Sequence, residues 1–421
     1  MKKIAKLLLA VIILFVNSCQ KDSIYIEDIN NTKTTNQQNK GFNNSGYNEL
    51  IILYPDGTTD IEKQQKRIEY GVENYKQCKC ADENLELWVF SSGNSGNINI
   101  EEKKETAKVD EEIESVGLNN TISIQQDQFI SASQTGILDT AITKIVQSNT
   151  GITVAVLDTG VDYNYNGFTS PFLYNSGPDA CDDNNYKEKF GWNFVENNNN
   201  PFDNYPGKHG TIVTNIITSN LKNNNIQHQI LPVKIANANG NIKYFDALCG
   251  FKYAIKKENV KIVNMSFGWY SENFELLQEF IQEVENTILV VCSAGNQYLN
   301  NDIIPHYPSS YESENILAMA GLEETASIGF INSNPNLAYF SNYGNNSVDL
   351  AAASENIPFA YNNQIFYVNG TSFSTAYGSF FSALNYQNGM TAPALKNQVI
   401  MNSVFSQNLQ DIKYSKHILN N

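Results

Sequence analysis

From residue 150 onward, short continuous apolar runs alternate with amphipathic stretches. The apolar runs are ITVAVLD (152–158), VKIVNMSFG (260–268) and TILVVCSAGN (287–296). Each run ends in polar or glycine residues, which is typical of strands that are covered on both faces of a parallel sheet. Between the runs, residues 245–255 and 274–284 place apolar side chains at helical spacing. The pattern predicts an α/β domain over 150–421, with a parallel sheet flanked by helices.

An earlier part of the chain has a different pattern, which predicts a small α+β domain over 46–126. The expected elements are a strand at 49–55, a helix at 60–72, a strand at 85–90, an acidic helix at 100–116 and a strand at 121–125. A polar stretch at 127–149 separates this domain from the α/β domain and is interpreted as a linker and processing region.

The first residues have the pattern of an export signal. Lys2, Lys3 and Lys6 precede the apolar run LLLAVIILFV (7–16), which is shorter than the roughly 20 residues needed to span a bilayer. The run leads into VNSC (16–19), and we expect a signal peptide over 1–18. The polar stretch 19–45, rich in asparagine and threonine, is then a flexible tether.

The charge composition argues against one class of binding partner. The chain has 28 Lys and Arg against 44 Asp and Glu, a formal net charge of −16. Because this charge repels a phosphate backbone, nucleic acid is not an expected partner. The cysteines leave their pairing open: without Cys19 they are odd in number, and CKC (78–80) lacks the spacing of a zinc knuckle. We expect Cys292 to be a buried thiol and predict no metal site built on cysteine.

The candidate chemistry lies in three short motifs. Asp158 follows a strand in DTG, His209 stands in HGT before a helical stretch, and Ser372 stands in GTS before another. Taken singly, each has an ordinary structural explanation: a turn aspartate, a satisfied histidine, a helix N-cap. Open α/β sheets carry their sites at the carboxyl ends of the strands, where Asp158, Ser266 and Asn296 are expected.

The three motifs together, in the order Asp, His, Ser, resemble the subtilisin-like serine proteases. The resemblance covers roughly 150–400 and includes VNMSFG before the helix at 274–284 and VVCSAGN around Asn296. It implies that Ser372 is the nucleophile, His209 its base and Asp158 the carboxylate that orients the imidazole. Asn296, with the Ser372 N–H, would stabilise the oxyanion.

The resemblance also implies a substrate-binding site and a role for the N-terminal domain. Six residues would form this substrate-binding site. Ser266, Phe267 and Gly268 would pair with an extended peptide, and Ser293, Ala294 and Gly295 would surround the substrate residue before the scissile bond. The small domain resembles the family's prodomain, with a ferredoxin-like fold, and would act as inhibitor and folding aid. A non-inhibitory tether domain is the alternative.

Two further expectations concern an anchor and a bound ion. VNSC resembles the lipobox of bacterial lipoproteins, in which Cys19 is acylated and anchors an exported envelope protein; simple signal-peptide cleavage and secretion are the alternative. No cofactor is required. Asp182, Asp183 and Asp203 could hold calcium, although a solvated acidic loop is favoured.

Departures from the family pattern leave rival functions open. Residues 212–215 replace the usual H-V-A-G after HGT, and residues 373–376 lack the usual proline after the serine. A catalytically inactive, peptide-binding envelope protein is therefore one alternative. An aspartic protease is another, because VLDTGVD also resembles the loop of those enzymes, although His209 and Ser372 would then be unexplained.

Overall fold

The computed structural model describes residues 42–43, 48–91, 99–124, 151–177, 180–183, 185–270, 272–324 and 334–419. These residues belong to one compact unit, Gly41–Asn421. The expected signal peptide, Cys19 and the processing region 127–149 lie outside them. Of the helices that the structure describes, none combines the length and apolar character needed to cross a bilayer.

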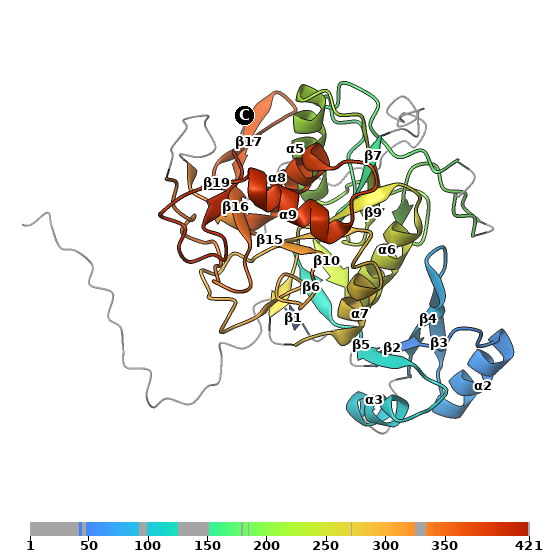
Figure 1. The fold of residues 1–421 in the computed structure, drawn as a ribbon. Coiled ribbons are helices and arrows are strands. Elements are labelled where there is room, and N and C mark those ends of the chain that lie inside the picture. Colours follow the sequence, from blue (N-terminus) through green and yellow to red (C-terminus); the bar gives the residue numbers. More distant parts are fainter. Residues whose placement is uncertain are drawn as a thin grey trace, which may run out of the picture. The chain divides into compact units, whose positions relative to one another are not determined.

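A nine-stranded sheet forms the centre of the C-terminal domain, as expected for an α/β fold (Figure 1). Its strands lie in the order β19-β20-β16-β15-β13-β11-β7-β9-β8. Their bounds are β7 Ile152–Asp158, β8 Trp192–Asn193, β9 His228–Lys234, β11 Val260–Met265, β13 Leu289–Ser293, β15 Ile316–Leu322, β16 Leu350–Ala353, β19 Val404–Phe405 and β20 Lys416–His417. Neighbouring strands are parallel except β19, which is antiparallel to β20.

Helices cover both faces of this sheet, which explains why its central strands are largely apolar on both faces. In β7, Val154 and Val156 pack with α5 (His209–Asn223), α8 (Thr371–Asn385) and α9 (Ala392–Asn402). The alternate residues Ala155 and Leu157 pack with α6 (Tyr244–Lys256) and α7 (Glu275–Glu283). Since successive side chains of a strand point to opposite faces, a sheet between two helix layers needs a continuous apolar run.

The N-terminal domain has the ferredoxin-like arrangement expected of it. Its elements are β2 Glu49–Leu53, α2 Asp60–Tyr70, β3 Asn74–Cys78, β4 Asp82–Val89, α3 Ile100–Lys108 and β5 Ser115–Leu118. The antiparallel sheet has the order β3-β4-β2-β5. A capping box between Thr59 and Glu62 starts α2, and Gly71, in the left-handed conformation, ends it.

Two of the expected N-terminal elements differ from the structure. The acidic helix ends at Lys108, because residues 115–118 form β5 and pair with β2 in the middle of the sheet. The strand expected at 121–125 is present as β6 (Thr121–Ser123), but it pairs outside the four-stranded sheet, with β1 (Phe42–Asn43) and β10 (Asn241–Lys243). Local propensity cannot predict either outcome, since both depend on pairing with distant strands.

The N-terminal sheet uses both of its faces. Leu50 and Ile52 of β2 face the domain's own helices, in a cluster with Trp88. The alternate residues Ile51 and Leu53 belong to the core cluster that contains α6 and α7. The second face of the sheet is therefore buried against the C-terminal domain.

Polar and covalent contacts add to this interface. Lys76 forms an ion pair with the buried Asp246, with 2.8 Å between Nζ and Oδ1. Two disulfides cross between the domains: Cys78 with Cys249, and Cys80 with Cys181. The CKC motif of β3 and its following turn is thus the covalent link between the two domains. Of the cysteines that the structure describes, Cys292 is a free, buried thiol, as expected from its apolar run.

Candidate active site

The candidate catalytic residues come from the ends of the central strands and from the starts of two helices. Asp158 is the last residue of β7, His209 the first residue of α5, and Ser372 the second residue of α8. Asn296 follows the end of β13. Sequence analysis expected Asp158, Ser266 and Asn296 at this edge, and the parallel register of β7, β11 and β13 brings their segments together.

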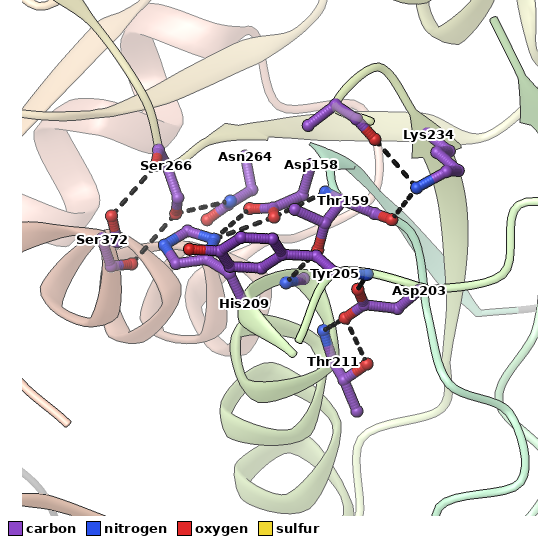
Figure 2. A network of polar contacts seen from close by, with 12 residues as sticks. Asp158, Thr159, Asp203, Tyr205, His209, Thr211, Lys234, Asn264, Ser266 and Ser372 are labelled. Carbon is purple, nitrogen blue, oxygen red and sulfur yellow. Dashed lines mark hydrogen bonds and ion pairs between the residues drawn. The ribbon is translucent and has the colours of Figure 1, made fainter. Parts of the chain in front are cut away.

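The carboxylate of Asp158 contacts the imidazole of His209. His209 Nδ1 lies 2.8 Å from Asp158 Oδ1 and 3.0 Å from Oδ2, and both side chains are buried (Figure 2). Glycine at 210 permits the start of α5 to pack against this strand end, because a Cβ there would lie 2.3 Å from the Gly160 carbonyl oxygen and 3.1 Å from Asp158 Oδ1. Among the described residues, no hydrogen-bond partner stands beside His209 Nε2, although that atom is buried.

The Ser372 side chain makes its hydrogen bond with Ser266 rather than with this histidine. Ser372 Oγ donates to the carbonyl oxygen of Ser266 at 2.9 Å, and Ser266 Oγ donates to the carbonyl oxygen of Ser372 at 2.9 Å (Figure 2). The ring of Phe373, the next residue, has its centroid 5.8 Å from that of His209. The structure therefore brings Asp158 and His209 into contact, whereas the hydroxyl of Ser372 is bonded to Ser266 and not to His209.

Asn296 is held by the residue that precedes Ser372. Its Oδ1 accepts from the Thr371 N–H at 2.8 Å and from Thr371 Oγ1 at 2.9 Å. These two hydrogen bonds fix the orientation of the Asn296 amide. Its Nδ2 lies on the side of Gly370, 3.6 Å from the position that a Cβ on residue 370 would take. Ser372 N–H belongs to the first turn of α8, whose N–H groups have no acceptor within the helix. Two hydrogen-bond donors, Asn296 Nδ2 and the Ser372 N–H, therefore lie at the start of α8.

A buried network of charged residues supports the loop before His209. Lys208, fully buried, forms an ion pair with Asp162 at 3.2 Å and donates to the Asp203 carbonyl oxygen at 2.7 Å. Asp203 accepts from Thr211 N at 3.0 Å and from Thr211 Oγ1 at 2.6 Å (Figure 2). Burial raises the pKa of Asp203, which the two buried lysines, Lys208 and Lys234, oppose.

Lys234 supports the segment that follows Asp158, on the other side of the Asp158–His209 pair. At the end of β9, its Nζ donates to the carbonyl oxygens of Thr159 at 2.6 Å and Ala236 at 2.8 Å. Burial lowers the pKa of this lysine to about 8. Sequence reasoning missed Lys208 and Lys234, because a single lysine within a loop or strand resembles a solvated surface residue. The local signal that could have found Lys234 is that it ends an otherwise largely apolar strand.

The six residues expected to bind substrate have four different environments. Ser266 is buried and contacts Ser372, as described above. The side chains of Phe267 and Ala294 lie in the core, so these residues can present only backbone to a ligand. Ser293 donates from Oγ to the Phe267 carbonyl oxygen at 3.4 Å. Gly268 and Gly295 both contact His306.

The three aspartates considered for calcium do not lie together in one loop. Asp203 belongs to the buried network, whereas Asp183 accepts from the N–H groups of Asn185 and Tyr186 at 3.0 and 2.8 Å. Across the described ranges, no three His, Cys, Asp or Glu side chains gather in a way that could hold a metal ion. Calcium binding therefore stays the less favoured of the two sequence-based interpretations.

The fold resembles those of subtilisin-like proteinases. A cold-adapted subtilisin-like serine proteinase matches with a TM-score of 0.50 at 20% sequence identity, over 64% of this chain and 88% of that one. A structure of subtilase cytotoxin SubAB matches with a TM-score of 0.50 at 19% identity, over 67% and 90%. These likenesses define the class of fold.

Sequence comparison gives the family. The model of the subtilase family matches residues 149–417, and the chain therefore belongs to that family. An intracellular serine protease of Paenibacillus polymyxa is 31% identical over 49% of this chain, and the major intracellular serine protease of Bacillus subtilis is 31% identical over 49%. The chain spans 57% and 59% of the lengths of these relatives. A cell wall-associated protease of Bacillus subtilis is 29% identical over 55% of this chain and 23% of its own length.

Proposed function

We propose that this protein is a serine endopeptidase in which Ser372, His209 and Asp158 form a catalytic triad. The observation that carries the proposal is the buried His209 imidazole, which has one nitrogen on Asp158 and the other without a partner among the described residues. An imidazole held in this way is a base for a nearby hydroxyl. The relatives named as serine proteases support the same conclusion.

The reaction requires Ser372 Oγ to leave the Ser266 carbonyl and turn toward His209 Nε2. Such a change of χ1 moves the hydroxyl between staggered positions. Ser372 Oγ then attacks the peptide carbonyl while His209 takes its proton, and Asp158 stabilises the imidazolium. His209 returns the proton to the leaving amine, which gives an acyl-enzyme. Water, activated by the same imidazole, hydrolyses the ester and restores Ser372.

We propose that Asn296 Nδ2 and the Ser372 N–H stabilise the oxyanion of this reaction. The anchoring of Asn296 Oδ1 by Thr371 supports this, because it fixes the amide before substrate binds. A donor fixed in advance needs no reorganisation when charge develops on the carbonyl oxygen. The buried network of Lys208, Asp203 and Lys234 would position His209 and Asp158 rather than contact substrate.

We propose that the N-terminal domain is a prodomain that inhibits the enzyme and assists its folding. In support, β6 leaves this domain and adds to β10 of the catalytic domain, with Ile122 opposite Ile242. The Ile124 N–H donates to the Gly240 carbonyl oxygen at 2.8 Å. Gly240 packs against Tyr205, in the loop that leads to His209. The last described residue of this segment, Ile124, is therefore held near the loop that leads to His209, and we propose that processing occurs within 127–149.

We also propose that the protein is exported and anchored by a lipid on Cys19. The apolar run 7–16 and the VNSC motif support this, and one relative is named as a cell wall-associated protease. Partition of the full-length protein into a detergent phase tests the anchor. Cys19→Ala should move the protein to the aqueous phase, and equal partition of both forms would exclude acylation at this residue.

Labelling by a serine-directed fluorophosphonate tests the proposed activity. We expect the processed protein to be labelled, with the modified peptide containing Ser372, because the reagent needs a serine activated by a base. An aspartic protease would cleave peptides without being labelled. Neither labelling nor peptide cleavage after full processing would indicate the inactive, peptide-binding alternative.

A further inference from the structure

The two segments proposed to hold the substrate leave the sheet side by side. β11 and β13 are parallel neighbours, with Met265 opposite Cys292. Ser266–Gly268 follows the first strand and Ser293–Gly295 ends the second, and the Ser293 hydroxyl bridges them through the Phe267 carbonyl. In the proposed function, the side chain of the substrate residue before the scissile bond would enter between these segments.

The imidazole of His306 occupies the space between them. A Cβ on Gly268 would lie 2.6 Å from His306 Nε2, and a Cβ on Gly295 would lie 3.0 Å from His306 Cδ2. The ring thus lies close to the backbone of both segments. Glycine at 268 leaves the room that the imidazole occupies, whereas a Cβ at 295 would first meet Asn342 Nδ2 at 2.6 Å and the Tyr270 hydroxyl at 2.7 Å. Pairing of β14 (His306–Tyr307) with β12 (Trp269–Tyr270) sets this position, with Tyr270 opposite His306.

Neighbouring side chains fix the ring. His306 Nδ1 lies 3.1 Å from Ser309 Oγ, and the Tyr270 ring packs edge-on with a centroid distance of 4.8 Å. The Tyr270 hydroxyl accepts from Asn342 Nδ2 at 2.8 Å and contacts Gln297. His306 is 4% exposed, and burial lowers its pKa to about 3. The imidazole is therefore a neutral, immobile part of the structure at neutral pH.

We propose that His306 forms the floor of the pocket for the residue before the scissile bond and restricts that residue to glycine, alanine or serine. This inference rests on the proposed function. A large side chain, such as phenylalanine, needs the volume that the imidazole and the Tyr270 phenol occupy. Displacing them would break the hydrogen bonds of the buried His306 and the half-buried Tyr270, and this loss exceeds the free energy gained by burying the substrate side chain.

Two fluorogenic peptides that differ only in alanine or phenylalanine before the cut test this inference on the processed enzyme. We expect the wild type to cleave the alanine peptide with a kcat/KM at least about 100-fold higher than that for the phenylalanine peptide. In His306→Gly, the ratio of kcat/KM for the phenylalanine peptide to that for the alanine peptide should rise at least about tenfold. His306→Asn, which keeps a polar side chain of smaller volume, should give an intermediate ratio.

His228→Ala is the matched control. His228 is also a buried histidine, but it lies at the amino end of β9 and bonds to Thr218, so its removal should leave the ratio unchanged. The inference is overturned if the wild type cleaves both peptides equally. It is also overturned if the His306 variants are labelled by fluorophosphonate yet keep the wild-type ratio. Failure of the proposed function looks different, because the wild type would then be neither labelled nor active on either peptide.

Discussion

Replacing Ser372 with alanine should reduce kcat for peptide hydrolysis by about 10⁶, the effect that loss of the triad serine has in subtilisin. An alanine side chain has no oxygen to attack the carbonyl, so no acyl-enzyme can form. The rate that remains should come from substrate binding and from the donors of Asn296 and the helix start. Burst kinetics with an activated ester, compared between wild type and variant, measure the acylation step directly.

Ser374→Ala provides the control for this variant. Ser374 lies in the same turn of α8 and is buried, but its Oγ bonds to the Thr371 carbonyl oxygen of its own helix at 3.0 Å. Its removal should leave kcat within a factor of about 3, since such a local bond contributes little. Retention of wild-type kcat in Ser372→Ala would refute the assignment of the nucleophile.

The two disulfides should keep the N-terminal and catalytic domains together after the chain is cut between Ile124 and Gly151. Cys78–Cys249 and Cys80–Cys181 join residues on opposite sides of that segment, with Cα distances of 5.5 and 5.3 Å. A processed sample should therefore run as one band on a denaturing gel without reductant and as two bands with it. Mass spectrometry of the reduced sample identifies the processing bond.

Variants that remove the disulfides separately and together make this expectation specific. C78S/C249S retains the second bridge and C80S/C181S retains the first, so each processed variant should remain one band without reductant. The quadruple variant should give two bands in the same conditions. Two bands from the processed wild type without reductant would show that neither bridge forms in the protein.

The disulfides between the two domains limit the effect of cutting the connecting chain. If the N-terminal domain is an inhibitor, cutting the connecting chain does not release it, and inhibition can end only when the domain moves while it remains bonded or when the bridges are reduced. If Cys19 is acylated, the same bridges keep the mature enzyme at the membrane. The interface at Ile51, Leu53 and the Lys76–Asp246 ion pair would hold the domain in place before reduction.

Much of the catalytic domain could be predicted because its signals are local. The apolar run at 152–158 coincides with β7, and the amphipathic stretches at 245–255 and 274–284 lie in α6 and at α7. A strand or helix covered by other elements carries that burial in its own residue pattern. The polar strand β3, with the sequence NYKQC, carries no such pattern and was missed, since its place at the edge of the sheet depends on β4.

The residue pattern predicts the α/β class of the large domain, the position of Asp158 at a strand end, and the motifs that relate the chain to the subtilases. The partners of the CKC cysteines, the buried network behind His209 and the position of His306 near Gly268 and Gly295 become visible in the folded protein. The two groups of features differ in the range of the interactions that produce them. Periodicity and motif residues act within one element, whereas a disulfide partner, a buried charge or a filled pocket depends on segments brought together by folding.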